Sequence, residues 1–175
     1  MFEVKMHGDV AVLAMCHGKA NTIDIEFCEA IPRQLEELRT NASAVVLTGS
    51  GSIFSAGVDL VRFLSENEDY SRAFIPALAK AFAALYAFPK PMITAINGHA
   101  IAGGCIIAIA GDMRLMAAGD GRIGVPELKV GMPFPGMALE MVRQVCGRAT
   151  ERVLYLGERF TPDDALGVGL IDTVV

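Results

Sequence analysis

Residues 97–105, with the sequence Asn-Gly-His-Ala-Ile-Ala-Gly-Gly-Cys, lie between a β-branched run at 92–96 and an apolar run at 106–110. This order predicts a strand followed by a buried helix, with Gly103 and Gly104 at the junction. The first N–H groups of a helix have no intrahelical acceptor, and glycines let a ligand approach them. The partial charge there, about +0.5 of an elementary unit, favours an anion or a developing oxyanion. Taken alone, the glycine pair is better explained by tight packing of a helix on a sheet.

A second segment, residues 53–60 (Ile-Phe-Ser-Ala-Gly-Val-Asp-Leu), follows a predicted strand and a glycine turn at 49–52. Its small residues also leave backbone N–H groups accessible. Two such strand ends could converge on one carbonyl oxygen and hold it as it becomes an oxyanion. Loss of one such donor typically costs about 2.7–4 kcal/mol of transition-state stabilisation. By itself, Ser-Ala-Gly can simply turn the chain, so only the two segments together favour an oxyanion hole.

The elements that must position these segments alternate between strands and helices. Apolar runs predict strands at 10–15, 44–48, 92–96 and 113–117 and an extended piece at 123–125. Helical periodicity predicts helices at 25–39, 71–88, 104–110, 136–146 and 150–156, and one that starts within 161–165. Asp24 and Thr161 are candidate N-caps, whereas Pro76 counts against a continuous helix. The alternation predicts an α/β fold with a largely parallel sheet, in a single domain over residues 1–175.

Composition narrows the class of protein. The chain is 53% hydrophobic and 20% charged, with a net charge of −5, which is typical of a globular domain and argues against a nucleic-acid partner. The most apolar window, 100–110, is too short to span a membrane, and the N-terminus lacks signal-peptide features, so we expect a cytoplasmic protein. The cysteines and histidines lack metal-ligand spacing, and we expect free thiols and no metal site. The apolar ending at 169–175 resembles an interior strand and suggests that the chain is truncated.

With the later Gly124-Val125-Pro126-Glu127, these motifs closely resemble the crotonase family, also called the enoyl-CoA hydratase/isomerase superfamily. The resemblance runs from 18–23 through 54–60 and 90–98 to 161–165 and 169–172. It implies a crotonase-like spiral of ββα units whose C-terminal helical lid would lie beyond Val175. It also implies a homotrimer or a dimer of trimers.

The same resemblance assigns roles within a site for a coenzyme A thioester, which is a substrate, with no covalently bound cofactor. Val58 and Gly103 would form the oxyanion hole through their backbone N–H groups. The resemblance also implies substrate or coenzyme A binding by Lys19, Ala20, Ala56, Asp59, Leu60, Gly104 and Pro126. Lys19 could equally be an ordinary surface lysine.

The acid/base residues decide which reaction is expected. Hydratases of the family use two glutamates, but the first of these positions is Ile106 here and only the second, Glu127, is present. One carboxylate can move a proton from the α to the γ carbon of a 3-enoyl thioester, as in the Δ3,Δ2-enoyl-CoA isomerases that this pattern resembles. The dienoyl isomerases carry a further aspartate where this chain has Pro135. Burial among Ile106, Val125, Leu128 and Met132 would raise the pKa of Glu127.

Several alternatives remain open from the sequence. The same scaffold could hydrate, decarboxylate or hydrolyse an acyl-CoA, or the chain could bind coenzyme A without catalysis. Glu140 is a second candidate for a carboxylate that faces the pocket, whereas a structural role is expected for His99. We expect Asp112 and Arg114 to join the end of the buried helix to the next strand. We also expect part of the acyl pocket to come from residues 65–87.

Overall fold

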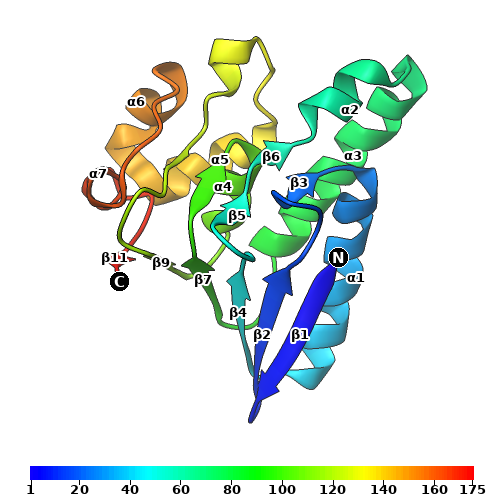
Figure 1. Ribbon diagram of the computed structural model, residues 1–175, viewed down its shortest axis with the longest axis vertical. Coiled ribbons are helices and arrows are strands. Elements are labelled where there is room, and N and C mark those ends of the chain that lie inside the picture. The colour runs from blue at the N-terminus through cyan, green and yellow to red at the C-terminus, as the bar shows by residue number, and fades with distance from the viewer.

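Six strands from widely separated parts of the chain form the main sheet of the computed structural model, which describes residues 1–175. Their order is β1 (Phe2–His7), β2 (Val10–Met15), β4 (Ala44–Thr48), β7 (Met92–Ile96), β9 (Met113–Met116) and β11 (Thr173–Val174). All neighbours are parallel except β1 and β2, which form an antiparallel hairpin. Figure 1 shows the strands spread from β11 at the left to β1 at the right.

Two smaller parallel sheets continue the strands of the main one. The first joins β10 (Ile123–Gly124), β8 (His99–Ile101) and β5 (Ile53–Ser55), and the second joins β3 (Thr22–Ile23) and β6 (Gly57–Val58). A long strand is therefore followed by a short one and then by a helix, as in β2–β3–α1 and β7–β8–α4. This repeat is the predicted spiral of ββα units.

The helices cover the sheets from two sides. Helices α1 and α3 pack against each other at the right of Figure 1, α5, α6 and α7 gather at the left, and every residue of α4 is buried between them. No helix is both long and apolar enough to cross a membrane. The helical segments are α1 (Ile25–Asn41), α2 (Leu60–Ser65), α3 (Glu68–Tyr86), α4 (Gly103–Ala108), η1 (Glu127–Val130), α5 (Gly136–Cys146), η2 (Gly147–Ala149), α6 (Thr150–Tyr155) and α7 (Pro162–Gly167).

The predicted strands at 10–15, 44–48 and 92–96 are confirmed, as are the α/β class and the largely parallel sheet. The expectation that Pro76 interrupts the helix predicted at 71–88 was wrong. Helix α3 runs through Pro76, whose ring lies on the exposed side of the helix. Strand β1 was not predicted, although its sequence alternates between apolar and polar residues; in the structure five of its six residues are exposed. The predicted buried helix begins at Gly103 and ends at Ala108, earlier than expected at both ends.

The expected roles of Asp112 and Arg114 need a correction. Asp112 Oδ2 accepts a hydrogen bond from the Met92 N–H at 2.8 Å, at the start of β7. The Arg114 guanidinium instead binds Asp172, with 2.8 Å between Arg114 Nε and Asp172 Oδ2. These residues join strands to neighbouring segments of the sheet, and they do not join α4 to β9.

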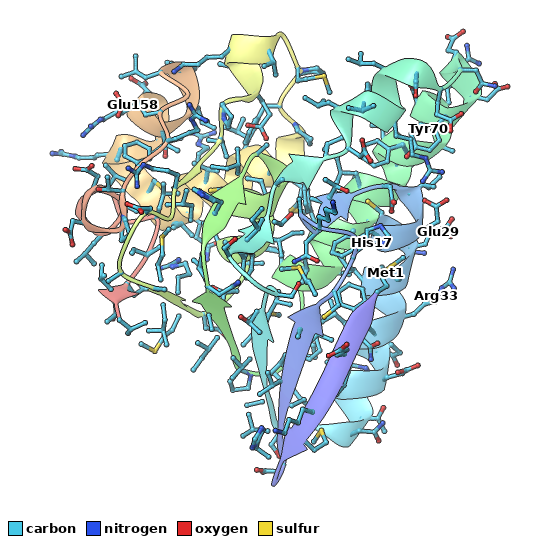
Figure 2. All side chains as sticks on the ribbon, in the orientation of Figure 1. Met1, His17, Glu29, Arg33, Tyr70 and Glu158 are labelled. Atoms are coloured by element: carbon cyan, nitrogen blue, oxygen red, sulfur yellow. The ribbon has the colours of Figure 1, made fainter.

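Helix α1 begins at a carboxylate with several partners. Asp24 Oδ1 accepts the Phe27 N–H at 2.8 Å, which confirms the predicted N-cap. Asp24 Oδ2 lies 2.7 Å from His17 Nε2 and 3.5 Å from Arg62 Nη1. His17 lies beside the N-terminal end of α1 in Figure 2. One carboxylate thus joins α1 to the turn before β3 and to α2.

Replacement of Asp24 tests which of these contacts stabilises the fold. We expect Asp24→Ala to lower the free energy of unfolding in urea by about 1–2 kcal/mol, because an N-cap acceptor is lost. Asp24→Asn keeps a cap acceptor and is expected to lose less. Equal losses in the two variants would show that the charge of Asp24, and not its cap, provides the stabilisation.

Candidate active site

A mostly apolar pocket with a cavity volume of about 170 Å³, partly open to solvent, lies between α3, the start of α4 and the segment from η1 to α5. Helix α3 contributes one wall through Phe74, Ile75, Leu78 and Phe82, as expected for residues 65–87. Glu127 is the only ionisable side chain in the lining. The remaining lining residues are Ala56, Val58, Leu60, Ile101, Ala102, Gly103, Ile106, Pro126, Val130, Met132, Pro133, Phe134, Pro135 and Ala138.

The two glycine-containing segments meet at this pocket. A Cβ atom built on Gly57 would lie 2.6 Å from the Ile101 carbonyl oxygen and 3.1 Å from the Gly103 nitrogen. One built on Gly104 would lie 2.3 Å from the Ser55 carbonyl oxygen. The two distances to carbonyl oxygens, 2.6 and 2.3 Å, are too short for a real Cβ atom, so only glycine permits this approach. The structure therefore brings Val58 and Gly103 to one side of one pocket.

Neither Val58 nor Gly103 uses its N–H in the neighbouring secondary structure. Along a strand, successive N–H groups point to opposite sides. Because the Asp59 N–H donates to the Ile23 carbonyl at 3.0 Å, the Val58 N–H faces away from β3, toward the side where α4 packs on β6. Gly103 is the first residue of α4, and its N–H has no intrahelical acceptor. The geometry suits an oxygen that carries negative charge.

Ala102, which precedes Gly103, has an unusual backbone. Its φ of 56° lies in the left-handed region that few residues other than glycine adopt. The Ala102 N–H donates to the Gly124 carbonyl at 2.8 Å, and its carbonyl accepts the Cys105 N–H at 2.8 Å. These bonds hold the strained turn from which α4 begins, and they fix the direction of its first free N–H groups.

Glu127 begins the short helix η1 and is half-buried. Its Oε2 atom is inaccessible to solvent and has no hydrogen-bond partner. Burial raises the pKa of Glu127 to about 7, an effect that outweighs a hydrogen bond from its own backbone. A carboxyl group with this pKa can both take and return a proton near neutral pH.

The prediction of which side chains surround Glu127 is confirmed only in part. Ile106 and Met132 line the same pocket, and Val125 is buried. Leu128, however, is 47% exposed, because η1 is a single turn that directs this side chain outward. The apolar lining of this pocket therefore includes Ile106 of α4, Val130 at the end of η1 and Met132 after it, and not Leu128.

The other residues that the sequence singled out divide into two groups. Ala56, Leu60 and Pro126 line the pocket. Lys19, Ala20, Asp59 and Gly104 do not, although Gly104 packs on Ser55 and the Ala20 carbonyl accepts the Ala56 N–H at 2.9 Å. Asp59 caps α2 by accepting the Arg62 N–H at 3.0 Å, and Lys19 is exposed in a turn.

The prediction that Glu140 faces the pocket was wrong. The side chain is exposed, and its Oε1 atom lies 3.4 Å from Nη1 of Arg143 on the same helix. The buried face of α5 consists of Ala138, Met141, Val142 and Cys146, which turns Glu140 outward. His99 has a structural contact, as expected, since its Nδ1 accepts the Arg122 N–H at 3.2 Å.

Sequence reasoning missed two further parts of the site. The Pro-Phe-Pro run at 133–135 was not assigned to the pocket, yet all three residues line it. An apolar run with two prolines next to a candidate catalytic glutamate is a signal that could have indicated a pocket wall. Buried Asn21 and Ser55 gave no comparable signal, because single polar residues without a spacing pattern do not reveal burial.

Comparison with known proteins agrees with this geometry. The model of the family "Enoyl-CoA hydratase/isomerase" matches residues 5–175. The rat mitochondrial enoyl-CoA delta isomerase 1 is 34% identical, over all of this chain and 62% of its own length, so the chain spans about three fifths of that relative. A short-chain-enoyl-CoA hydratase of Clostridium acetobutylicum is 31% identical over 98% of this chain and 67% of its own length.

A solved structure gives the same result for the fold. The structure of human mitochondrial delta3-delta2-enoyl-CoA isomerase superposes with a TM-score of 0.95 at 31% identity, covering 99% of this chain and 70% of the human chain. The family match, the ββα spiral and the two facing glycine segments agree with one another. The chain belongs to the enoyl-CoA hydratase/isomerase family.

Proposed function

We propose that this protein is an enzyme that moves the double bond of a 3-enoyl-CoA to position 2, with Glu127 as its single acid/base. The observation that carries this proposal is the pocket lining, in which Glu127 is the only ionisable side chain and the apolar Ile106 stands on α4. Addition of water normally needs a second group to orient and deprotonate it. An isomerisation needs only one group that carries a proton between two carbons.

The proposed reaction has two proton transfers. The Glu127 carboxylate removes a proton from the α-carbon, and the electron pair moves toward the thioester oxygen to give a dienolate. The Val58 and Gly103 N–H groups donate to that oxygen as its charge develops. Glu127 then returns the proton to the γ-carbon, so that the double bond lies between the α and β carbons and no water is consumed.

The remaining site residues take supporting roles in the proposal. Ala56, Leu60 and Pro126 contact the thioester arm and the near part of the acyl chain. Lys19, Ala20 and Asp59 lie toward the coenzyme A portion of the substrate, and Gly104 shapes the oxyanion hole from behind. The name of the rat relative supports isomerisation, whereas the Clostridium relative makes hydration of a 2-enoyl-CoA the second candidate.

A glutamine at position 127 tests the acid/base role. With a 3-enoyl-CoA as substrate, we expect Glu127→Gln to lower kcat by about 10²–10⁴-fold while acyl-CoA binding persists, because an amide cannot accept the proton. The absorbance of the conjugated 2-enoyl product reports turnover, and isothermal titration with a saturated acyl-CoA reports binding.

Glu140→Gln is the matched control, since Glu140 is exposed and outside the pocket. It is expected to keep wild-type kinetics. Full isomerase turnover in Glu127→Gln would contradict the single-base mechanism. Rapid hydration of a 2-enoyl-CoA by the wild-type protein, without double-bond migration in a 3-enoyl-CoA, would favour the second candidate.

The pH dependence of the reaction gives an independent test. Only the ionised form of Glu127 can act as the base, and its pKa is raised to about 7. We therefore expect kcat/KM to fall as the pH drops below about 7 and to level off above it, because kcat/KM reports the free enzyme. A profile that is flat from about pH 5 to about pH 8 would exclude Glu127 as the titrating base.

A further inference from the structure

Few polar residues are buried in this protein, and most of them lie beside the proposed oxyanion hole. The buried polar or charged residues are Asn21, Asp24, Ser55 and Thr94, with exposures of 1%, 8%, 0% and 0%. Asn21 and Asp24 flank β3, and Ser55 ends β5, directly before β6. Burial of polar groups is unfavourable unless they are hydrogen-bonded, so their partners indicate what they do.

The Ser55 hydroxyl connects the starts of two short strands. It donates to the Asn21 carbonyl at 2.7 Å and accepts the Gly57 N–H at 3.2 Å. Asn21 immediately precedes β3, and Gly57 is the first residue of β6. The hydroxyl group therefore supplements a parallel ladder that has only two residues on each side.

The Asn21 side chain connects the same region to its other neighbours. Asn21 Nδ2 donates to the Phe54 carbonyl at 3.0 Å and to the Ile53 carbonyl at 3.4 Å. Asn21 Oδ1 accepts the His17 N–H at 2.7 Å. Its backbone φ of 47° lies in the left-handed region, where asparagine is better tolerated than most residues. The side chain thus fixes β5 against the turn that leads into β3.

These bonds bear on the direction of one N–H group. The peptide that carries the Val58 N–H lies between Gly57, held by Ser55, and Asp59, held by Ile23. Rotation of β6 about its axis would turn this N–H away from the pocket. The Ser55 carbonyl is also the atom that a Cβ on Gly104 would approach to 2.3 Å. Ser55 therefore contacts both segments that supply the proposed donors.

We propose that Ser55 and Asn21 are positioning residues that fix the orientation of the Val58 N–H and its separation from Gly103. This inference rests on the proposed function, because it takes the Val58 N–H as an oxyanion donor. Neither side chain lines the pocket, so both act through the backbone of β6 and do not touch the substrate.

Ser55→Ala and Thr94→Val form a matched pair for the test. Thr94 is also fully buried, and its hydroxyl also donates to a backbone carbonyl, that of Ala108, at 2.7 Å. It stands on β7 outside the pocket lining. Each variant loses one buried hydroxyl, so both should lose stability, but only Ser55→Ala should misdirect the Val58 N–H.

We expect Ser55→Ala to lower kcat for a 3-enoyl-CoA by about 10- to 100-fold with little change in KM, because a misdirected donor acts mainly in the transition state. Thr94→Val should keep kcat within about twofold. Infrared difference spectra of a bound saturated acyl-CoA with a ¹³C-labelled thioester carbonyl provide a readout that stability alone does not move. Its stretching frequency should rise in Ser55→Ala, as expected for a weaker hydrogen bond, and stay unchanged in Thr94→Val.

Asn21→Gly keeps the left-handed backbone accessible while it removes the side chain, and it should change kcat and the carbonyl frequency in the same direction. It also serves as the test if Ser55→Ala does not fold.

An unchanged kcat and an unchanged carbonyl frequency in the folded variants would overturn the inference while the isomerase proposal stands. Equal losses of kcat in Ser55→Ala and Thr94→Val would also overturn it. A wild-type protein without isomerase turnover would refute the proposed function, and the carbonyl frequencies would then decide the inference alone.

Discussion

The contact between successive turns of the spiral, made without side chains, is the constraint on which the rest of the site depends. The β4–β5 unit and the β7–β8 unit meet at glycines, and a Cβ on Gly98 would lie 1.9 Å from the Ser52 carbonyl oxygen. The same is true at Gly57 and Gly104, closer to the pocket. Because backbone lies directly against backbone, the spacing of the two free N–H groups is set by the packing of the sheets. A loop that carried both donors would hold them less rigidly.

The electrostatics of the pocket follow from its apolar lining. A low-dielectric wall strengthens the attraction between backbone N–H groups and a developing negative charge. The same wall disfavours the charged form of Glu127, which raises its pKa. One physical property of the lining thus favours both roles in the proposed function, that of the N–H donors and that of the base. Ile106 contributes to this property because its side chain is apolar and buried.

Local signals in the sequence were sufficient for the class of fold, whereas the proposed site residues came from the family resemblance. Apolar runs located the inner strands, and Asp24 and Thr161 marked helix starts. The resemblance joined Val58, Gly103 and Glu127, which line one pocket in the structure. Strands β3 and β6 have two residues each, too few for any periodicity to show. Glu140 was misplaced although the helical period indicates its exposure, because Ala138, Met141, Val142 and Cys146 form the apolar face of α5 and Glu140 lies opposite it. The bonds from Asn21 to Phe54 and from Ser55 to Asn21 join residues more than thirty positions apart, so they follow only from the tertiary structure.

The pocket wall from α3 has a consequence for how such a protein can diversify. Phe74, Ile75, Leu78 and Phe82 lie on one helix, whereas Glu127 and the free N–H groups belong to other elements. Helix α3 also packs on α1, and of its pocket residues Phe82 reaches the start of α4, where a Cβ on Gly103 would lie 3.6 Å from Phe82 Cζ. Substitutions at Phe74, Ile75 and Leu78 can therefore change the room for the acyl tail of the proposed substrate while Glu127 and the start of α4 keep their places. Under the proposed function, selectivity for the tail and competence for the reaction are separable traits, open to selection one at a time.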